Sequence, residues 1–340
     1  QAYQEDDYWF VDLAGENVDG RLRLPTDLDE NRLMVAEFDR LYWPESEEEL
    51  GESHMDSRKL PPLDFYAADL RFGDVELGTV RFESFPTEYG MRIENFETQA
   101  PYFELNASGD WLALGSSDFD VTLTANDLGD ALESFGFAGM VDDGQLIASL
   151  HATWPGAPQD FEMARLSGDL QLSIGKGQII EVNPGAGRIF GLLSLQTLPR
   201  RLQLDFSDLF KSGLAFDSIS GDFELNKGEA FTRDMVIKGP TADVYIQGQT
   251  NLATQDYNQV LTIVPKVSGA LPLVGAIAGG GVGAAAVMVL QNVFSEQIDK
   301  MTRYHYAVTG PWSDPQVELI GANESQLPVG QPIPEALKEG

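Results

Sequence analysis

Glycine, histidine and acidic residues are the parts of this sequence whose spacing or abundance could support chemistry. Gly185, Gly187 and Gly191 in PGAGRIFG precede an apolar run, and glycines before a helix can present backbone N–H groups to a phosphate. Their spacing is G-x-G-x-x-x-G, whereas a dinucleotide-binding loop needs G-x-G-x-x-G, and no Lys-Ser or Lys-Thr pair follows them. The stretch therefore predicts a tight turn into a helix and not a nucleotide site.

The other reactive residue types do not form a recognisable site. His54, His151 and His305 lie far apart in the sequence, and none belongs to an H-E-x-x-H motif. The chain has no cysteine, which excludes thiolate catalysis and sulfur-ligated metals, and it has no G-x-S-x-G motif. Paired carboxylates for glycoside hydrolysis stay open as an alternative, because their separation in space cannot be read from a sequence. We expect a protein that is not an enzyme and has no catalytic residue, no metal and no cofactor.

The charge of the chain restricts its partners. Lys and Arg total 22 and Asp and Glu total 54, so the formal net charge at pH 7 is 22 − 54 = −32. A chain of this sign repels phosphate backbones, so we expect no nucleic acid partner. The same charge opposes broad adsorption to anionic lipid, so any membrane contact should be local and apolar.

Alternation of apolar and polar residues dominates the sequence and is typical of half-buried strands. The stretch DLQLSIGKGQIIEV, residues 169–182, alternates up to Ile174 and again from Ile180, with two glycines between, which predicts a hairpin. The stretch GDFELNKGEAFTRDMVIKG, residues 221–239, predicts a second hairpin around its Asn-Lys-Gly turn. Strands should therefore make up most of the fold.

Successive meanders without long amphipathic helices between them favour an antiparallel sheet. A sheet of many strands must twist and curl. We expect a mainly β fold, an elongated, twisted antiparallel β-groove that forms an open trough, with a few short helices and a C-terminal apolar helical hairpin. The expected divisions are a single continuous fragment over 1–340, helical insertions at 126–137 and 185–198, an apolar helical segment at 268–301 and a linker-like tail at 322–340.

The apolar segment is long enough to cross a bilayer. The 22 residues from Gly269 to Leu290 carry no charge. Pro272 and the triplet Gly279–Gly281 argue against one straight helix, because each interior glycine costs about 1 kcal/mol relative to alanine. Three interpretations stay open: a broken hairpin that caps the trough and dips into a membrane leaflet, an internal plug, and a membrane span.

Residues Asn183 to Phe223, NPGAGRIFGLLSLQTLPRRLQLDFSDLFKSGLAFDSISGDF, resemble the C-terminal periplasmic region of the AsmA-like family, in its YhdP branch. The similarity continues through GPTADVYIQGQTNL and VLTIVPKVSGALPLVGAIAGG to YAVTGPWSDPQVELI, and it covers residues 60–320. Members are envelope proteins of Gram-negative bacteria, related to TamB and to bridge-like lipid transfer proteins. The resemblance implies phospholipid transport between the inner and outer membranes, with acyl chains sliding along a hydrophobic β-groove.

The resemblance also implies a place in the cell. This chain would be the periplasmic C-terminal part of a protein anchored in the inner membrane, and it would face the outer membrane. The implied partners are phospholipids and the inner leaflet of the outer membrane, with envelope proteins as further candidates. The alternative is a structural or scaffolding envelope protein that binds protein partners without lipid passage.

Two sets of residues are the candidate lipid contacts. The lipid-groove set contains apolar residues at alternating strand positions, and a one-residue error in register would move them to the other face. Its members are Leu170, Leu172, Ile174, Ile180, Val182, Leu202, Leu204, Phe206, Phe223, Leu225, Ile237, Val244, Ile246, Leu261 and Ile263. The membrane-contact set lies in the apolar segment and contains Leu271, Leu273, Val274, Ile277, Val282, Val289, Leu290, Val293 and Phe294.

Overall fold

The computed structural model describes residues 1–27, 31–44, 56–137, 139–180, 214–266, 303–313 and 315–323. The described chain is mainly β and its sheet is open, as the sequence predicts. It groups into two compact units, and the single continuous fragment over 1–340 stays a prediction. Unit 1 contains residues 1–174 and 224–228, and unit 2 contains residues 175–223 and 229–340. Each unit is described by itself below.

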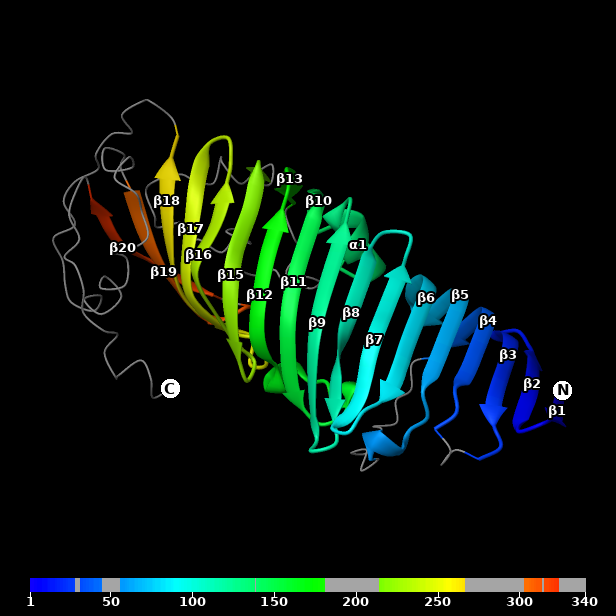
Figure 1. Ribbon diagram of the computed structural model, residues 1–340. Helices are drawn as coiled ribbons and strands as arrows, with labels where there is room; N and C mark the ends of the chain where they lie inside the picture. Colours follow the sequence, from blue (N-terminus) through cyan, green and yellow to red (C-terminus); the bar gives the residue numbers. More distant parts are fainter. Residues whose placement is uncertain are drawn as a thin grey trace. The chain divides into compact units, whose positions relative to one another are not determined.

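Unit 1 is a run of eleven paired strands (Figure 1). Each strand pairs with the next one in the order β1, β2, β3, β4, β5, β6, β7, β8, β9, β11 and β12. Their bounds are β1 (Ala2–Glu5), β2 (Tyr8–Ala14), β3 (Val18–Pro25), β4 (Met34–Trp43), β5 (Leu63–Phe72), β6 (Val75–Pro86), β7 (Gly90–Gln99), β8 (Glu104–Leu112), β9 (Ser116–Ala125), β11 (Leu146–Pro155) and β12 (Ser167–Ile174).

One pair departs from the antiparallel arrangement that the sequence predicts. β4 and β5 run parallel, whereas every other pair in unit 1 is antiparallel. Antiparallel strands need only a tight turn, but parallel strands need a connection that returns the chain to the starting end of the sheet. The connection between Trp43 and Leu63 contains the short helix η2 (Ser57–Lys59).

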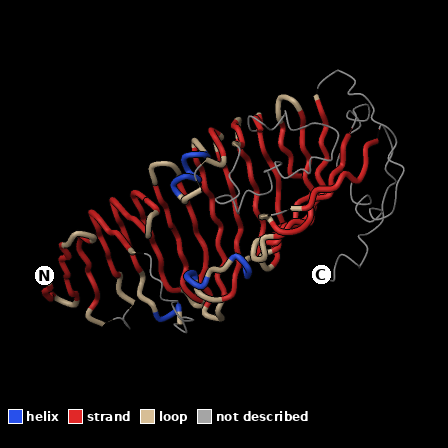
Figure 2. The backbone as a smooth tube through the Cα atoms, turned by 180° about the vertical axis from the view of Figure 1, so that it is seen from behind, coloured by secondary structure: helices blue, strands red, loops and turns tan. Residues whose placement is uncertain are grey.

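The short helices of unit 1 lie beside the ends of the strands (Figure 2). Helix α1 (Leu128–Ser134) lies inside the expected insertion at 126–137. It begins after Asp127, whose carboxylate accepts a hydrogen bond from the Asp130 N–H at 3.1 Å, and it ends before Gly136, whose φ is 86°. The helices η3 (Pro158–Asp160) and η4 (Met163–Arg165) lie in the connection from β11 to β12, and the short strand β10 (Val141–Asp143) follows α1.

Unit 2 contains a second run of antiparallel strands. Strands β16, β17, β18, β19 and β20 pair in that order, and the short strands β13 and β14 pair with each other. The bounds are β13 (Gly177–Ile179), β14 (Leu214–Phe216), β15 (Ser218–Asn226), β16 (Glu229–Lys238), β17 (Ala242–Asn251), β18 (Asp256–Pro265), β19 (Arg303–Pro311) and β20 (Gln316–Asn323). The last three residues of β15 belong to unit 1.

The hairpin predicted at 221–239 is confirmed, and the hairpin predicted at 169–182 is wrong. β15 and β16 are joined by a turn in which Lys227 and Gly228 have φ of 48° and 81°, as a type I′ turn requires. The hairpin expected at 169–182 is wrong, because β12 pairs with β11 and β13 pairs with β14. The alternation in that stretch predicts two strands but does not identify their partners.

Several expected features lie outside the described residues. These are the helical insertion at 185–198, the apolar segment at 268–301 and all but the first residues of the tail. Within the described residues, no helix combines the length and the apolar character that crossing a bilayer requires.

Candidate functional site

Strand register assigns the side chains of unit 1 to two faces, because residues opposite each other on paired strands point to the same side. Starting from Val11 and following partners from strand to strand gives one apolar residue in each of ten strands. We call this set the apolar row. It consists of Val11, Leu22, Ala36, Phe65, Phe82, Phe96, Ala107, Val121, Leu150 and Leu170.

The apolar row remains partly accessible to solvent. Ala36 is buried, whereas the other nine members are half-buried. Beside it, Ala67, Val80 and Thr98 form the start of a neighbouring row and are 0%, 1% and 1% exposed. A contiguous apolar surface that keeps contact with water is typical of a binding surface.

Aromatic side chains pack against one another near both ends of the strands of unit 1. At the C-terminal end of β11, Trp154 stacks on Phe119 with ring centroids 5.4 Å apart, and Phe161 meets it edge-on at 5.3 Å. Near the N-terminal end of β8, Phe103 and Phe135 have ring centroids 4.9 Å apart. Trp154, Phe119 and Phe103 are buried in these contacts, whereas Phe135 and Phe161 are 39% and 43% exposed.

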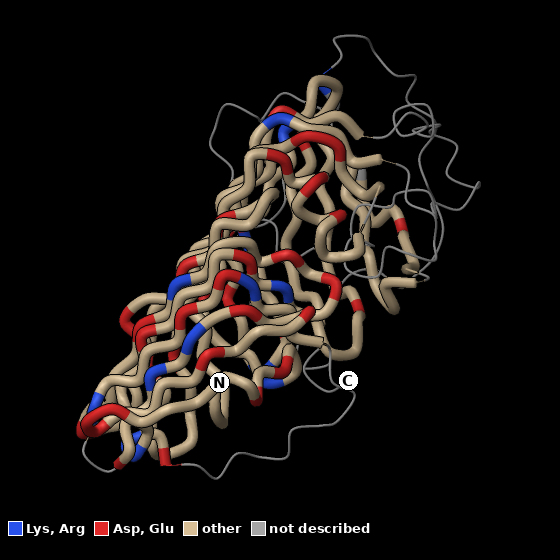
Figure 3. Tube along the Cα trace, turned by 90° about the vertical axis from the view of Figure 1, so that its right-hand side faces the viewer, with Lys and Arg blue, Asp and Glu red and all other residues tan. Residues whose placement is uncertain are grey.

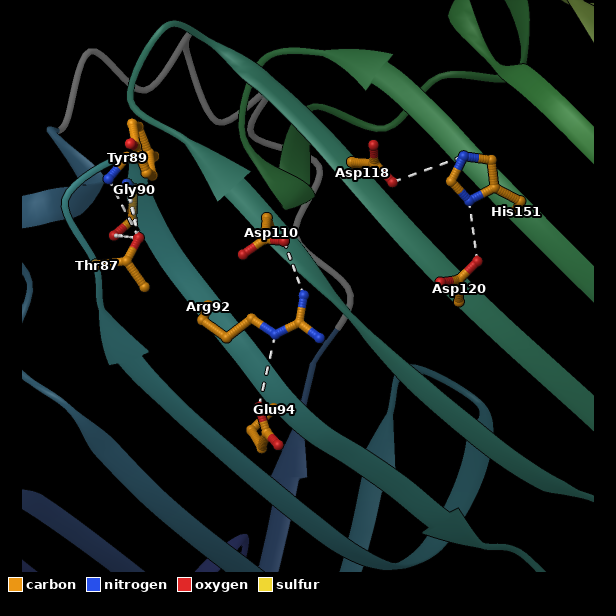
Figure 4. Close-up of polar contacts among 9 residues, drawn as sticks. All are labelled: Thr87, Tyr89, Gly90, Arg92, Glu94, Asp110, Asp118, Asp120 and His151. Carbon is orange, nitrogen blue, oxygen red and sulfur yellow. Dashed lines mark hydrogen bonds and ion pairs between the residues drawn. The ribbon is translucent and has the colours of Figure 1, made fainter.

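The opposite face of unit 1 carries charged and hydrogen-bonded side chains (Figure 4). Lys, Arg, Asp and Glu recur along the chain trace (Figure 3). Arg92 Nη1 donates to Asp110 Oδ2 at 2.8 Å, and its Nε lies 3.6 Å from Glu94 Oε2. His151 Nδ1 lies 2.9 Å from Asp120 Oδ1, and this hydrogen bond raises the pKa of the imidazole. Such a face needs no cover, because water solvates its charges.

The two histidines that the structure describes, His151 and His305, form no metal centre with described neighbours. His151 lies in β11 of unit 1, His305 lies in β19 of unit 2, and His54 is outside the described residues. In the part of the chain that the structure describes, no group of three or more histidine or acidic side chains could hold a metal ion. The glycines of PGAGRIFG also lie outside the described residues, so their expected turn stays a prediction.

Unit 2 has an apolar face of its own. Met235 pairs with Ile246, Ile246 with Leu261, and Leu261 with Tyr306. One step along the strands, Ile237, Val244 and Ile263 are paired in the same way. These side chains are buried, and Ile246 and Ile237 are 0% and 1% exposed.

A comparison with known proteins identifies the family. The family model described as YhdP protein matches residues 1–317. The chain belongs to the YhdP family. The intermembrane phospholipid transporter YhdP of Escherichia coli strain K12 is 30% identical over 223 residues, which are 64% of this chain and 18% of that protein. No solved structure is significantly similar to the chain. The family match confirms the resemblance found in the sequence.

The structure brings most of the described lipid-groove residues of this YhdP-family chain onto the two apolar faces. Leu170, Leu172 and Ile174 lie on the apolar face of unit 1. Ile237, Val244, Ile246, Leu261 and Ile263 lie on the apolar face of unit 2. Phe223 and Leu225 alternate with exposed residues in β15, and Leu225 is buried. Their contact with lipid stays a prediction.

The remaining residues of the two sets are placed differently or are not described. Ile180 follows β13 and is 38% exposed, away from the paired positions of both faces. Val182, Leu202, Leu204 and Phe206 lie outside the described residues, and so does the whole membrane-contact set. These positions therefore also stay predictions.

Sequence reasoning missed the nine members of the apolar row that precede Leu170. Alternation is present in these strands, but bulges interrupt it. In β7, Ile93 pairs with Gly109 and Phe96 pairs with Ala107, so two residues three positions apart lie on one face. Aromatic residues at similar places in β5, β6 and β7, namely Phe65, Phe82 and Phe96, were the available signal.

Proposed function

We propose that this YhdP-family chain transports phospholipids, with acyl chains lying along the apolar face and head groups in water. The observation that carries the proposal is the apolar row, in which ten successively paired strands each contribute one apolar side chain and nine of these are half-buried. The printed name of the Escherichia coli relative, an intermembrane phospholipid transporter, supports the same class of substrate.

The physical reason is the cost of hydrating hydrocarbon. Each methylene left in water costs about 0.8 kcal/mol, so an unshielded acyl chain faces a large barrier to crossing an aqueous space. Neighbouring strands lie about 4.8 Å apart. The distance between successive apolar side chains of the row is therefore shorter than the length of an acyl chain. A lipid can therefore move from strand to strand without exposing its whole tail.

We infer the location of the chain in the cell from its family and from the relative's printed name. The chain would act in the periplasm as one section of a bridge between the inner and outer membranes. The apolar segment at 268–301 would form the delivery end at the inner leaflet of the outer membrane, and envelope proteins would be further partners. Sliding breaks and forms no covalent bond, so the proposal includes no catalytic residue and no cofactor.

Site-specific photo-crosslinking tests the proposal with two adjacent positions. Leu150 belongs to the apolar row, and Ser149 pairs with Thr122 and Gln171 on the polar face. We expect benzoyl-phenylalanine at position 150 to form adducts with phospholipid from added vesicles, and the same group at position 149 to form few. Equal labelling at both positions, or no labelling at either, would overturn the proposal and favour the scaffold.

A further inference from the structure

Strand β18 places two polar side chains on the apolar face of unit 2. Tyr257 and Gln259 lie four and two positions before Leu261, so all three point to the same side. Tyr257 is 2% exposed and Gln259 is 3% exposed. The hydroxyl of Tyr257 and the Oε1 atom of Gln259 are buried and have no hydrogen-bond partner in the described part of the chain.

Such atoms require an explanation, because buried polar groups in proteins nearly always have a hydrogen-bond partner. The neighbouring polar groups are already in use. Trp312 Nε1 donates to Thr250 Oγ1 at 3.0 Å, and Thr250 Oγ1 donates to the carbonyl of Asp256 at 3.0 Å. The hydroxyl of Thr250, which is opposite Tyr257 on β17, therefore donates its proton elsewhere.

The ring of Tyr257 is held in place by an aromatic contact. Trp312 stacks on it with ring centroids 5.7 Å apart and an interplanar angle of 22°. On β19 the residue opposite Tyr257 is Gly310, and a Cβ added there would meet no atom within 4 Å. The hydroxyl is thus presented by a fixed ring beside a position that has no side chain.

The described neighbours Trp312, Thr250 and Gly310 are uncharged. Burial raises the pKa of its hydroxyl, and no charged group contributes to that shift. A charged group such as a phosphate would lose its hydration there without gaining a counter-charge, which is strongly unfavourable. The chemistry therefore selects a neutral group that forms hydrogen bonds.

We propose that Tyr257 and Gln259 bind the ester groups of a diacyl lipid. The Tyr257 hydroxyl donates to one ester carbonyl, and the Gln259 amide, after a half-turn about its terminal bond, donates through Nε2 to the other. Positions two apart on a strand are about 7 Å apart, and ester groups join the acyl chains to the polar part of the same lipid. Leu261 and Ile263, farther along β18, then lie beside the hydrocarbon. This inference rests on the proposed function and adds a point of recognition to it.

The test compares two lipids that differ only in these groups. The probes are dipalmitoyl phosphatidylethanolamine and its dihexadecyl ether analogue, which lacks both carbonyls, and their binding to the 340-residue chain is measured by competition in native mass spectrometry. We expect the ester lipid to bind about tenfold more tightly, as the loss of a buried hydrogen bond predicts. We expect the double variant Tyr257→Phe, Gln259→Leu to bind both lipids equally.

A matched variant controls for the loss of a tyrosine hydroxyl. Tyr245 pairs with Thr262 on the opposite face of unit 2, so Tyr245→Phe should keep the preference for the ester lipid. Tyr257→Phe alone should not lower the Tm of the lipid-free chain, because it removes a hydroxyl that has no protein partner. A fall in that Tm would show a partner within the protein and would overturn the inference.

The outcomes separate this inference from the proposed function. If the wild-type chain binds ester and ether lipids equally, or if the double variant keeps the preference, the ester site is wrong while lipid carriage stands. If the chain binds neither lipid, the proposed function fails and the ester site fails with it.

Discussion

His151 and His305 respond to pH in opposite directions, because one lies among carboxylates and the other is buried. His151 forms a hydrogen bond with Asp120, and Asp118 and Asp169 add to the rise in its pKa. His305 lies 3.0 Å from the Thr262 hydroxyl, and burial, with a smaller contribution from Arg303, lowers its pKa. Each shift is a pH-dependent contribution to folding stability.

We predict that His151→Asn destabilises the chain more at acid than at alkaline pH. Because the folded pKa is raised, the contribution is fully present below the unfolded value of about 6.5 and is lost as the pH rises through the folded value. The imidazole is substantially exposed, so the effect should be about 0.5 kcal/mol, as for exposed ion pairs. Urea unfolding of both proteins at about pH 5.5 and about pH 9 measures it.

His305→Asn supplies the control for this prediction. The lowered pKa of His305 means that the unfolded chain takes up the proton first, so the wild type loses this stability as the pH falls below about 6.5. The difference between the wild type and His305→Asn should therefore shrink at acid pH. Parallel pH profiles for the two variants would contradict the assigned environments.

At the scale of the element, the aromatic residues of the apolar row pack from strand to strand. Phe65, Phe82 and Phe96 occupy consecutive strands, and the rings of Phe82 and Phe96 meet edge-on with centroids 6.3 Å apart. Ala36 and Ala107 follow at the two sides. The row therefore has its largest side chains in β5, β6 and β7.

We predict that Phe82→Ala lowers the free energy of unfolding by about 2 kcal/mol, less than for a fully buried phenylalanine because Phe82 is half-buried. Phe85 lies in the same strand, pairs with Arg92 on the polar face and is 43% exposed. Phe85→Ala should cost less than about 0.5 kcal/mol. Guanidinium unfolding of the two variants gives the comparison, and equal losses would contradict the assignment of faces.

The sequence predicted strands better than their partners. The turn residues of 221–239 determine a hairpin because Lys227 and Gly228 adopt the positive φ that a tight connection needs. No comparable local signal links Ile174 to Ile180, and the pairing of β12 with β11 depends on contacts between distant parts of the chain. The parallel pair β4–β5 has the same origin, since the alternation within a strand does not determine the direction of its neighbour.

At the scale of the whole molecule, charge is absent from the apolar row although the chain carries a net charge of −32. The net charge predicts that any membrane contact is local and apolar, and this stays a prediction. Composition could not predict which residue of each strand belongs to the row. Bulges such as the one between Ile93 and Phe96 shift the alternation from one face to the other.

A single charge in the row tests whether its members act as one path. Val121 lies in β9 between Ala107 and Leu150, and the next residue, Thr122, points to the polar face. A carboxylate at position 121 cannot contact hydrocarbon without losing its hydration, so Val121→Glu should stop acyl chains from passing while Thr122→Glu should not. Photo-crosslinkers at Leu22 and Leu170 report lipid on the two sides of the block.

In the wild type and in Thr122→Glu, lipid taken up from vesicles should label both crosslinkers. In Val121→Glu, labelling should persist on the side where lipid enters and fall about tenfold or more on the other side, because desolvating a carboxylate costs more than 1.4 kcal/mol, the equivalent of a factor of ten. Unchanged labelling at both positions of a folded Val121→Glu variant would mean that lipids reach each strand independently from water. The row would then be a set of separate contacts and not a path.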